Sequence, residues 1–251
     1  MSFDVEQALH YQIANARILK FPFPHFYIGD IFPHDWYSQL RDNLPPQDCY
    51  QRLDETGTVT PGAYPERFVC ELGRACESEI ESAGKPGPWN EFRRVLDGPQ
   101  FAHRILGLFY DGVVERFGAD CELDFETECR LVRDFSNYAI TPHTDSPRKL
   151  VSLLFYLPPD DSMKELGTSI FVPNDPAFRC EGTKHHAFSQ FKKVMTAPYL
   201  PNSLLGFFKT DQAFHGVERI ERPSTQRDSV LYNIYVNHVG RRAAPAGISG
   251  L

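Results

Sequence analysis

From residue 124 onward the sequence is a series of short segments that are rich in strand-forming residues and separated by turn residues. No segment with a helical spacing of apolar residues lies between them. Some of the segments, above all residues 151–157, are almost continuously apolar, which is typical of strands covered on both faces. About seven such strands without intervening helices predict a β-sandwich or jelly roll for this part of the chain.

The N-terminal half follows a different pattern. Apolar residues recur at helical spacing over residues 4–19, and further helices are expected over 33–45 and 99–117. A short strand is expected over 26–28, whereas residues 46–66 are polar, contain glycine and proline, and are expected to form a loop. We therefore predict a mainly β protein with flanking helices. Its expected organisation is one domain over 1–251, with a helical N-terminal support region over 1–123, a jelly-roll core over 124–240 and a tail over 241–251.

The charge and the cysteine content restrict the classes of binding partner and the cellular compartment that we expect. The 251 residues include 26 basic and 33 acidic ones, for a formal charge of −7. This balance offers no basic surface, which argues against a nucleic-acid partner and against membrane binding. The longest apolar stretch is far too short to span a bilayer. The six cysteines form no CxxC pair and the N-terminus lacks the regions of a secretory signal, so we expect reduced thiols in a cytoplasmic protein.

The segment TPHTDSPRKLVSLLFYLPP, residues 141–159, places His143 and Asp145 two residues apart ahead of a predicted strand. Positions i and i+2 of a strand point to the same face, so both side chains are expected in one cavity. An imidazole and a carboxylate are suitable ligands for a first-row divalent metal. So short a motif also occurs by chance, and a solvated charged turn ahead of a strand is the competing interpretation.

A third candidate ligand is His215, which stands at the head of a later predicted strand in the segment DQAFHGVERI. A facial triad of ligands needs such a second histidine from a neighbouring strand. Gly216 follows it and would let another backbone approach closely. The competing interpretation is a core histidine that bonds a backbone group.

Arg227 begins the last predicted strand, RDSVLYNIYVN. An arginine that leads into a buried strand needs an anion, because an unpaired buried charge is costly, and its guanidinium fits a carboxylate with two hydrogen bonds. Ser229 lies two residues on, hence on the same face, and could donate its hydroxyl. Alternatively, Arg227 pairs with a nearby acid such as Glu218 or Asp228.

Taken in order, the HxD motif, the distal histidine and the following arginine form a constellation that chance produces rarely. The segments NYAITPHTDSPRKLVSLLFYLP, GTSIFVP, LLGFFKTDQAFHGV and RDSVLYNIYVN resemble the Fe(II)/2-oxoglutarate-dependent dioxygenases, in particular the prolyl-hydroxylase-like branch. The stretch FPFPHFYIGDIFP is similar to the N-terminal part of bacterial members. The resemblance covers the C-terminal half well and the first 45 residues loosely.

The resemblance implies a double-stranded β-helix, which is a jelly roll with a metal at one mouth. It implies that His143, Asp145 and His215 hold Fe(II), that 2-oxoglutarate fills two of the three open coordination positions, and that dioxygen takes the last. The implied activity is hydroxylation of a C–H bond in a small molecule or an amino-acid residue. The retained Asp145 favours oxygenation over halogenation, because halogenating relatives lack this carboxylate.

The resemblance also assigns the contacts of the co-substrate. Arg227 and Ser229 would bind the distal carboxylate of 2-oxoglutarate, and Tyr156, on the strand after the HxD motif, would reach the same group. Tyr138 occupies a region that often supplies another co-substrate contact. The rivals for the role of the arginine are Arg219 and Arg222.

Two other functions compete with the oxygenase. One is a cupin-like metal-dependent enzyme that takes no 2-oxoglutarate, and the other is a non-catalytic jelly-roll binding protein. Lys149 and Arg148 are expected in a solvated turn, or at the cavity mouth facing an anionic group of the substrate. His185 and His186 are expected at the surface. The substrate class stays open between a small molecule and an amino-acid or peptide substrate, and no sequence feature indicates an oligomeric state.

Overall fold

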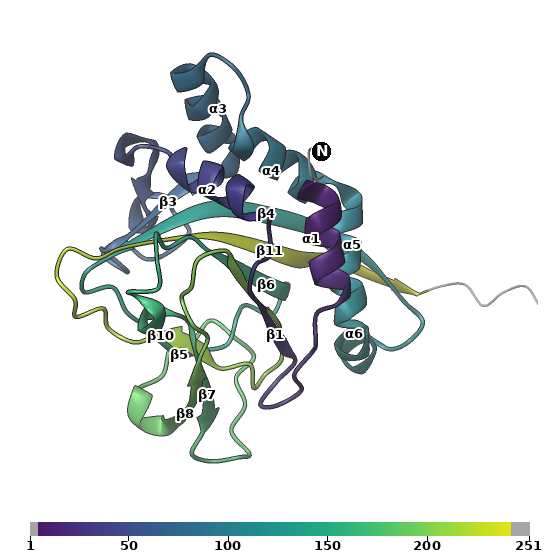
Figure 1. The fold of residues 1–251 in the computed structure, drawn as a ribbon. Coiled ribbons are helices and arrows are strands. Elements are labelled where there is room, and N and C mark those ends of the chain that lie inside the picture. Colours follow the sequence, from purple (N-terminus) through teal and green to yellow (C-terminus); the bar gives the residue numbers. More distant parts are fainter. Residues whose placement is uncertain (1–4, 242–251) are drawn as a thin grey trace, which may run out of the picture.

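Two antiparallel sheets face each other, and helices cover the outer face of the larger one (Figure 1). The structure is a computed structural model, and it describes residues 5–241. In spatial order, the larger sheet contains β1 (His25–Ile28), β9 (Ser203–Phe208), β6 (Lys149–Tyr156), β11 (Gln226–Arg241), β4 (Cys121–Phe135), β3 (Arg67–Glu71) and β2 (Gln51–Arg52). The smaller sheet contains β5 (Ile140–His143), β10 (His215–Val217), β7 (Ser169–Pro173) and β8 (Phe191–Thr196).

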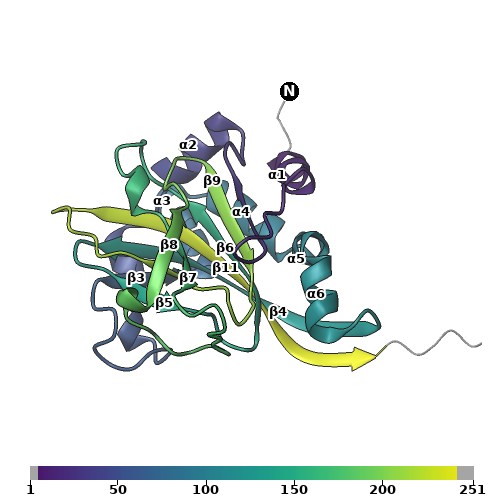
Figure 2. The same cartoon turned by 90° about the horizontal axis from the view of Figure 1, so that it is seen from below.

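The smaller sheet lies across the side of the larger sheet that the helices leave open (Figure 2). The α-helices of the described residues are α1 (Val5–Ala14), α2 (His34–Asp42), α3 (Leu72–Ala83), α4 (Pro88–Asp97), α5 (Pro99–Leu108) and α6 (Tyr110–Phe117). This arrangement confirms the predicted mainly β architecture, with a jelly-roll core and flanking helices. None of the helices in residues 5–241 is long and apolar enough to cross a membrane.

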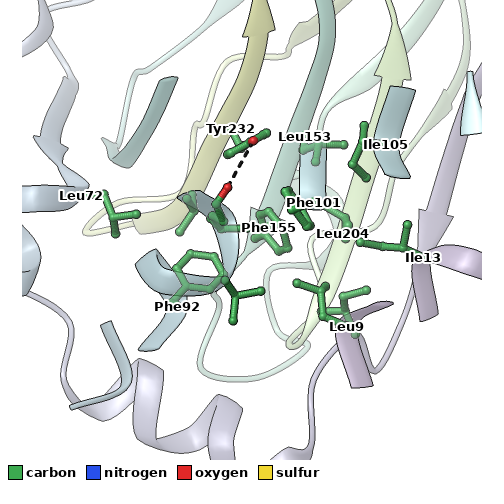
Figure 3. Close-up of a cluster of buried hydrophobic side chains, with 14 of the residues drawn as sticks. Leu9, Ile13, Leu72, Phe92, Phe101, Ile105, Leu153, Phe155, Leu204 and Tyr232 are labelled. Carbon is green, nitrogen blue, oxygen red and sulfur yellow. Dashed lines mark hydrogen bonds between the residues drawn. The ribbon is translucent and has the colours of Figure 1, made fainter. Parts of the chain in front are cut away.

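Strand β6 shows why residues 151–157 are almost continuously apolar. Its alternate residues Leu153 and Phe155 face the helices, whereas Leu154 and Tyr156 face the inside of the jelly roll. The helix-facing side chains pack with residues of α1, α4, α5, β9 and β11 in one large cluster (Figure 3). Burying a side chain such as Phe155, which is 1% exposed, contributes about 1.5–3 kcal/mol. Because both faces of β6 are covered in this way, the strand carries no polar stripe.

The N-terminal region differs from the prediction in two respects. Strand β3 and the short β2 extend the larger sheet, although β2 lies in the stretch 46–66 that was expected to form a loop and β3 was not expected as a strand. The helix expected over 99–117 is two helices, α5 and α6, that meet at Phe109. Phe109 is buried and packs against Phe26 and Phe208, so a bend at this position keeps its ring in the core. Of the tail predicted over 241–251, all but Arg241 lies outside the described residues.

Candidate active site

The three predicted metal ligands lie together at one end of the jelly roll. His143 is the last residue of β5 and His215 is the first residue of β10, and the two residues are direct partners in the smaller sheet. Asp145 lies in the turn after β5 rather than on the strand itself, yet it lines the same cavity as the two histidines. One ligand atom from each of the three side chains lies within 4.8 Å of the others. The proximity expected from the sequence is therefore present, and the role of the three as ligands stays a prediction.

Hydrogen bonds fix the tautomers of both imidazoles. His143 Nδ1 lies 3.0 Å from the carbonyl oxygen of Thr141, and His215 Nδ1 lies 2.9 Å from that of Ala213. A carbonyl oxygen only accepts, so each Nδ1 carries the proton and each Nε2 keeps its lone pair. Burial lowers the pKa of both histidines, which keeps the rings neutral. Two neutral imidazoles with free Nε2 atoms are prepared to bind a cation.

The carboxylate of Asp145 is ionised and held at both oxygens. Lys149 Nζ donates to Oδ1 at 2.9 Å, and Ser152 Oγ donates to Oδ2 at 2.8 Å. Burial raises the pKa of Asp145, but the charge and the hydrogen bond of the Lys149 ammonium outweigh it and place the pKa below its ordinary value. Asp145 Oδ1 is also the oxygen nearest to His215, at 3.9 Å from Nε2. The negatively charged Oδ1 of Asp145 and the neutral Nε2 atoms of His143 and His215 thus lie close enough together to bind one cation.

The cavity that contains these groups has a volume of about 260 Å³. Tyr64 and His185 belong to its lining, and a hydrogen bond of 2.9 Å links the tyrosine hydroxyl to Nε2 of the histidine. His185 was expected at the surface and is exposed, but its ring also stacks on His143 with 4.6 Å between the ring centroids. The other lining residues are Leu53, Val59, Arg67, Val132, Tyr138, Ile140, Lys149, Ser152, Leu154, Thr168, Phe207, Gly216, Val217, Ser229 and Leu231, together with the three candidate ligands.

Arg227 is fully buried, as its sequence context indicated, but its partner is one that the sequence did not suggest. Its Nη1 donates to Asp134 Oδ2 at 2.7 Å, and its Nε donates to the carbonyl oxygen of Leu166 at 2.6 Å. The alternative pairing with Glu218 or Asp228 is wrong, because those acids pair with Lys193 and Arg133. The rivals Arg219 and Arg222 are exposed and bond Asn137 Oδ1 and the carbonyl of Ser162.

Arg67, on β3, is a cavity residue that the sequence analysis missed. Its Nε and Nη2 donate to the two oxygens of Asp134 at 2.7 and 2.9 Å, and its guanidinium lies 4.2 Å from the centroid of the Tyr138 ring. Asp134 is 0% exposed and is shared between Arg67 and Arg227. Two guanidinium groups against one carboxylate leave one net positive charge in the buried interior. Such an excess is costly unless an anion joins the cluster.

Several polar atoms around this cluster have no hydrogen-bond partner within residues 5–241. They are Arg227 Nη2, Tyr138 Oη and Thr168 Oγ1. Buried polar groups are almost always bonded, so orphaned donors beside a positive charge indicate a binding place for an anion. Burial raises the pKa of Tyr138, which keeps its hydroxyl protonated as a donor. Ser229 lines the cavity here as well.

Tyr156 lies behind the cavity wall rather than on it. Its side chain is 0% exposed, and its hydroxyl oxygen accepts a hydrogen bond from the backbone N–H of Thr168 at 3.1 Å. The centroid of its ring is 5.7 Å from Cζ of Arg227. Because its oxygen serves as an acceptor in that bond, the phenolic proton stays available to donate to a further group.

Comparisons with known proteins establish the fold. No protein-family model matches the chain, and no curated protein matches it. A prolyl hydroxylase from Trichoplax adhaerens, solved with a peptide fragment of a hypoxia-inducible factor, is similar at a TM-score of 0.51 and 12% identity, covering 92% of this chain and 88% of that one. The non-heme α-ketoglutarate-dependent epimerase SnoN from nogalamycin biosynthesis is similar at a TM-score of 0.50 and 12% identity, covering 97% and 87%. The chain thus shares the jelly-roll fold of these two proteins.

Proposed function

We propose that this chain is an oxygenase that uses Fe(II), 2-oxoglutarate and dioxygen to hydroxylate a C–H bond of a small molecule or an amino-acid residue. The observation that carries the proposal is the content of a single cavity. Its lining holds two neutral imidazoles and a carboxylate, and also Arg67 and the orphaned hydroxyls of Tyr138 and Thr168. Arg67 shares Asp134 with Arg227, so the lining and the pair behind it carry one net positive charge. A metal that is chelated by a small dianionic acid would use both sets of groups.

The residues present fit Fe(II). His143 and His215 would bind it through Nε2, since each Nδ1 already has a protein partner. Asp145 would bind it through Oδ1, the oxygen that lies 3.9 Å from Nε2 of His215. Two histidines and one carboxylate with open positions are the ligand set of non-heme Fe(II) oxygenases. Bound together, the metal and 2-oxoglutarate supply the activation of dioxygen. Ser152 and the carbonyl groups of Thr141 and Ala213 would orient the ligands.

The buried cluster fits the distal carboxylate of 2-oxoglutarate. Arg227 would donate through Nη2, its one nitrogen without a partner in the described chain, and Ser229 would add its hydroxyl. Tyr156 would donate its phenolic proton, as the resemblance implies, and Tyr138, whose ring lies against the guanidinium of Arg67, would donate its hydroxyl. We add Arg67 to this set because it lines the cavity and its charge is only partly compensated by Asp134.

The competing functions leave part of the site without a use. In a cupin-like enzyme that takes no 2-oxoglutarate, the orphaned donors around Arg227 would have no ligand. In a non-catalytic binding protein, the complete and preoriented ligand set would have no purpose. The acidic composition favours a small molecule or an amino-acid or peptide substrate over a nucleic acid, and six unpaired cysteines support a cytoplasmic location.

The test is the weak visible charge-transfer band that Fe(II) and 2-oxoglutarate give when they chelate. We expect the band in the anaerobic wild-type protein and in Arg219→Met, which removes an exposed rival arginine. We expect His215→Ala to lose the band, and Arg227→Met to need at least about tenfold more 2-oxoglutarate, because a charge-assisted hydrogen bond is lost. Absence of the band from the wild-type protein with iron bound would refute the proposal.

A further inference from the structure

Lys149 places a buried ammonium group beside the candidate metal ligands. It is the first residue of β6, its side chain is 12% exposed, and it lines the cavity. The one hydrogen bond of its ammonium within the described residues is the 2.9 Å contact to Asp145 Oδ1. Its neighbour Arg148, by contrast, is 62% exposed and pairs with Glu126 at the surface. Of the two cations in this turn, one is therefore solvated and the other is part of the cavity.

The same oxygen of Asp145 serves both Lys149 and the metal position. Oδ1 receives the lysine hydrogen bond and is also the oxygen that faces Nε2 of His215. In the loaded protein a divalent cation shares this oxygen, so the carboxylate no longer compensates the ammonium. Two cations close together in a buried site repel strongly, because the effective dielectric constant is low. Lys149 then needs another anion.

The net charge of the cavity also indicates that a further anion is required. The charged side chains in its described lining, with the pair directly behind it, are the cations Arg67, Lys149 and Arg227 and the carboxylates Asp134 and Asp145. With the three lining histidines, His143, His185 and His215, neutral, they leave one positive charge. A divalent metal raises the total to three, and the dianion 2-oxoglutarate lowers it again to one. One anionic group is still required to make the filled site neutral.

No second carboxylate lines the cavity in the part of the chain that the structure describes, so the protein does not supply this anion. We propose that Lys149 binds a carboxylate group of the substrate, and that the substrate is a small carboxylic acid such as a free amino acid. The inference rests on the proposed function. The cavity volume of about 260 Å³ supports it, since pockets for drug-sized ligands start at about 300 Å³. The apolar wall formed by Val59, Leu154 and Leu231 would hold the rest of the molecule.

The test compares acetate with acetamide, which have nearly the same shape and differ in charge. The protein is loaded with Mn(II) and saturating 2-oxoglutarate, and the paramagnetic broadening of the methyl proton signal reports binding close to the metal. We expect acetate to bind at least about tenfold more tightly than acetamide, because a charge-assisted hydrogen bond is worth that much. The variant Lys149→Met should lose this preference, Lys149→Arg should recover part of it, and Arg148→Met should keep it.

Two controls distinguish a failure of the inference about Lys149 from a failure of the proposed function. Electron paramagnetic resonance checks that Lys149→Met still binds one Mn(II), and the anaerobic Fe(II) charge-transfer band checks that its affinity for 2-oxoglutarate changes by less than about threefold. An acetate preference that persists in Lys149→Met would overturn the inference, as would equal binding of acetate and acetamide to the wild-type protein. Loss of the band or of Mn(II) in Lys149→Met would also overturn it, because the lysine would then serve the co-substrate or the metal ligand. A wild-type protein without the band would instead refute the proposed function.

Discussion

Replacing Asp134 with Asn tests whether the buried cluster is built to receive an anion. Asp134 accepts three hydrogen bonds, two from Arg67 and one from Arg227, and is 0% exposed. Its neutralisation leaves two buried guanidinium groups without a counter-ion. Breaking a buried ion pair in this way costs about 3–5 kcal/mol. At about 2–4 °C per kcal/mol for a chain of this size, the melting temperature should fall by roughly 6–20 °C.

The informative result is the response of Asp134→Asn to 2-oxoglutarate. If the distal carboxylate of the ligand joins the cluster, it replaces part of the missing negative charge. Saturating 2-oxoglutarate with Mn(II) should then raise the melting temperature of the variant by more than it raises that of the wild type. Thermal unfolding of both proteins, with and without the ligand, measures this difference.

A matched control is Asp97→Asn, which removes the carboxylate of an exposed ion pair with Arg93. Surface pairs of this kind contribute about 0–1 kcal/mol, so the control should change the melting temperature by only a few degrees and should respond to 2-oxoglutarate like the wild type. The reasoning is refuted if Asp134→Asn unfolds like this control, or if 2-oxoglutarate stabilises the variant less than the wild type.

Three further predictions concern the metal site. Ser152→Ala removes the hydrogen bond to Asp145 Oδ2. Calorimetric titration with Mn(II) should show an affinity lower by about 10- to 100-fold, which is the usual effect of losing a group that orients a metal ligand. Gly216→Ala puts a methyl group 2.5 Å from a carbonyl oxygen of the neighbouring strand β5, so urea unfolding should show a loss of about 1–3 kcal/mol, and a neutral effect would contradict the close approach. The metal-free protein should lose stability as the pH falls from 7 to 5. In this range His143 and His215 take up protons in the unfolded chain, near the ordinary value of 6.5, whereas burial lowers their pKa in the folded chain. Urea unfolding at several pH values should show a smaller loss in His143→Gln, and an equal loss would contradict the assigned cause.

The parts of the molecule that local pattern governs could be predicted from the sequence. Strand β6 could be predicted because both of its faces are covered, so its apolar residues follow one another almost without interruption. His143 and Asp145 are close in sequence, so their proximity in space follows from local geometry alone. His215 could be added because it stands at the head of a strand, in an apolar setting where an imidazole needs a partner.

The rest of the site depends on pairings between distant segments, which local patterns do not encode. Arg67 reaches the cavity because β3 pairs with β4, and this register sets Arg67 opposite Asp134. Asp134 in turn lies opposite Arg227, because β11 pairs with the other edge of β4. The sequence around Arg67 indicated neither a strand nor a buried charge. The prediction that Arg227 is buried was therefore right, whereas the alternative pairing with Glu218 or Asp228 was wrong.

We propose that His143, Asp145 and His215 bind one ferrous ion, with 2-oxoglutarate extending from it to the buried arginines. Anomalous diffraction at the iron absorption edge, from crystals grown anaerobically with both ligands, tests it most directly. We expect one strong anomalous peak between the two Nε2 atoms and Asp145 Oδ1, with ligand density running to Arg227. An iron peak elsewhere in the molecule, or a co-substrate that does not reach the arginine cluster, would contradict it.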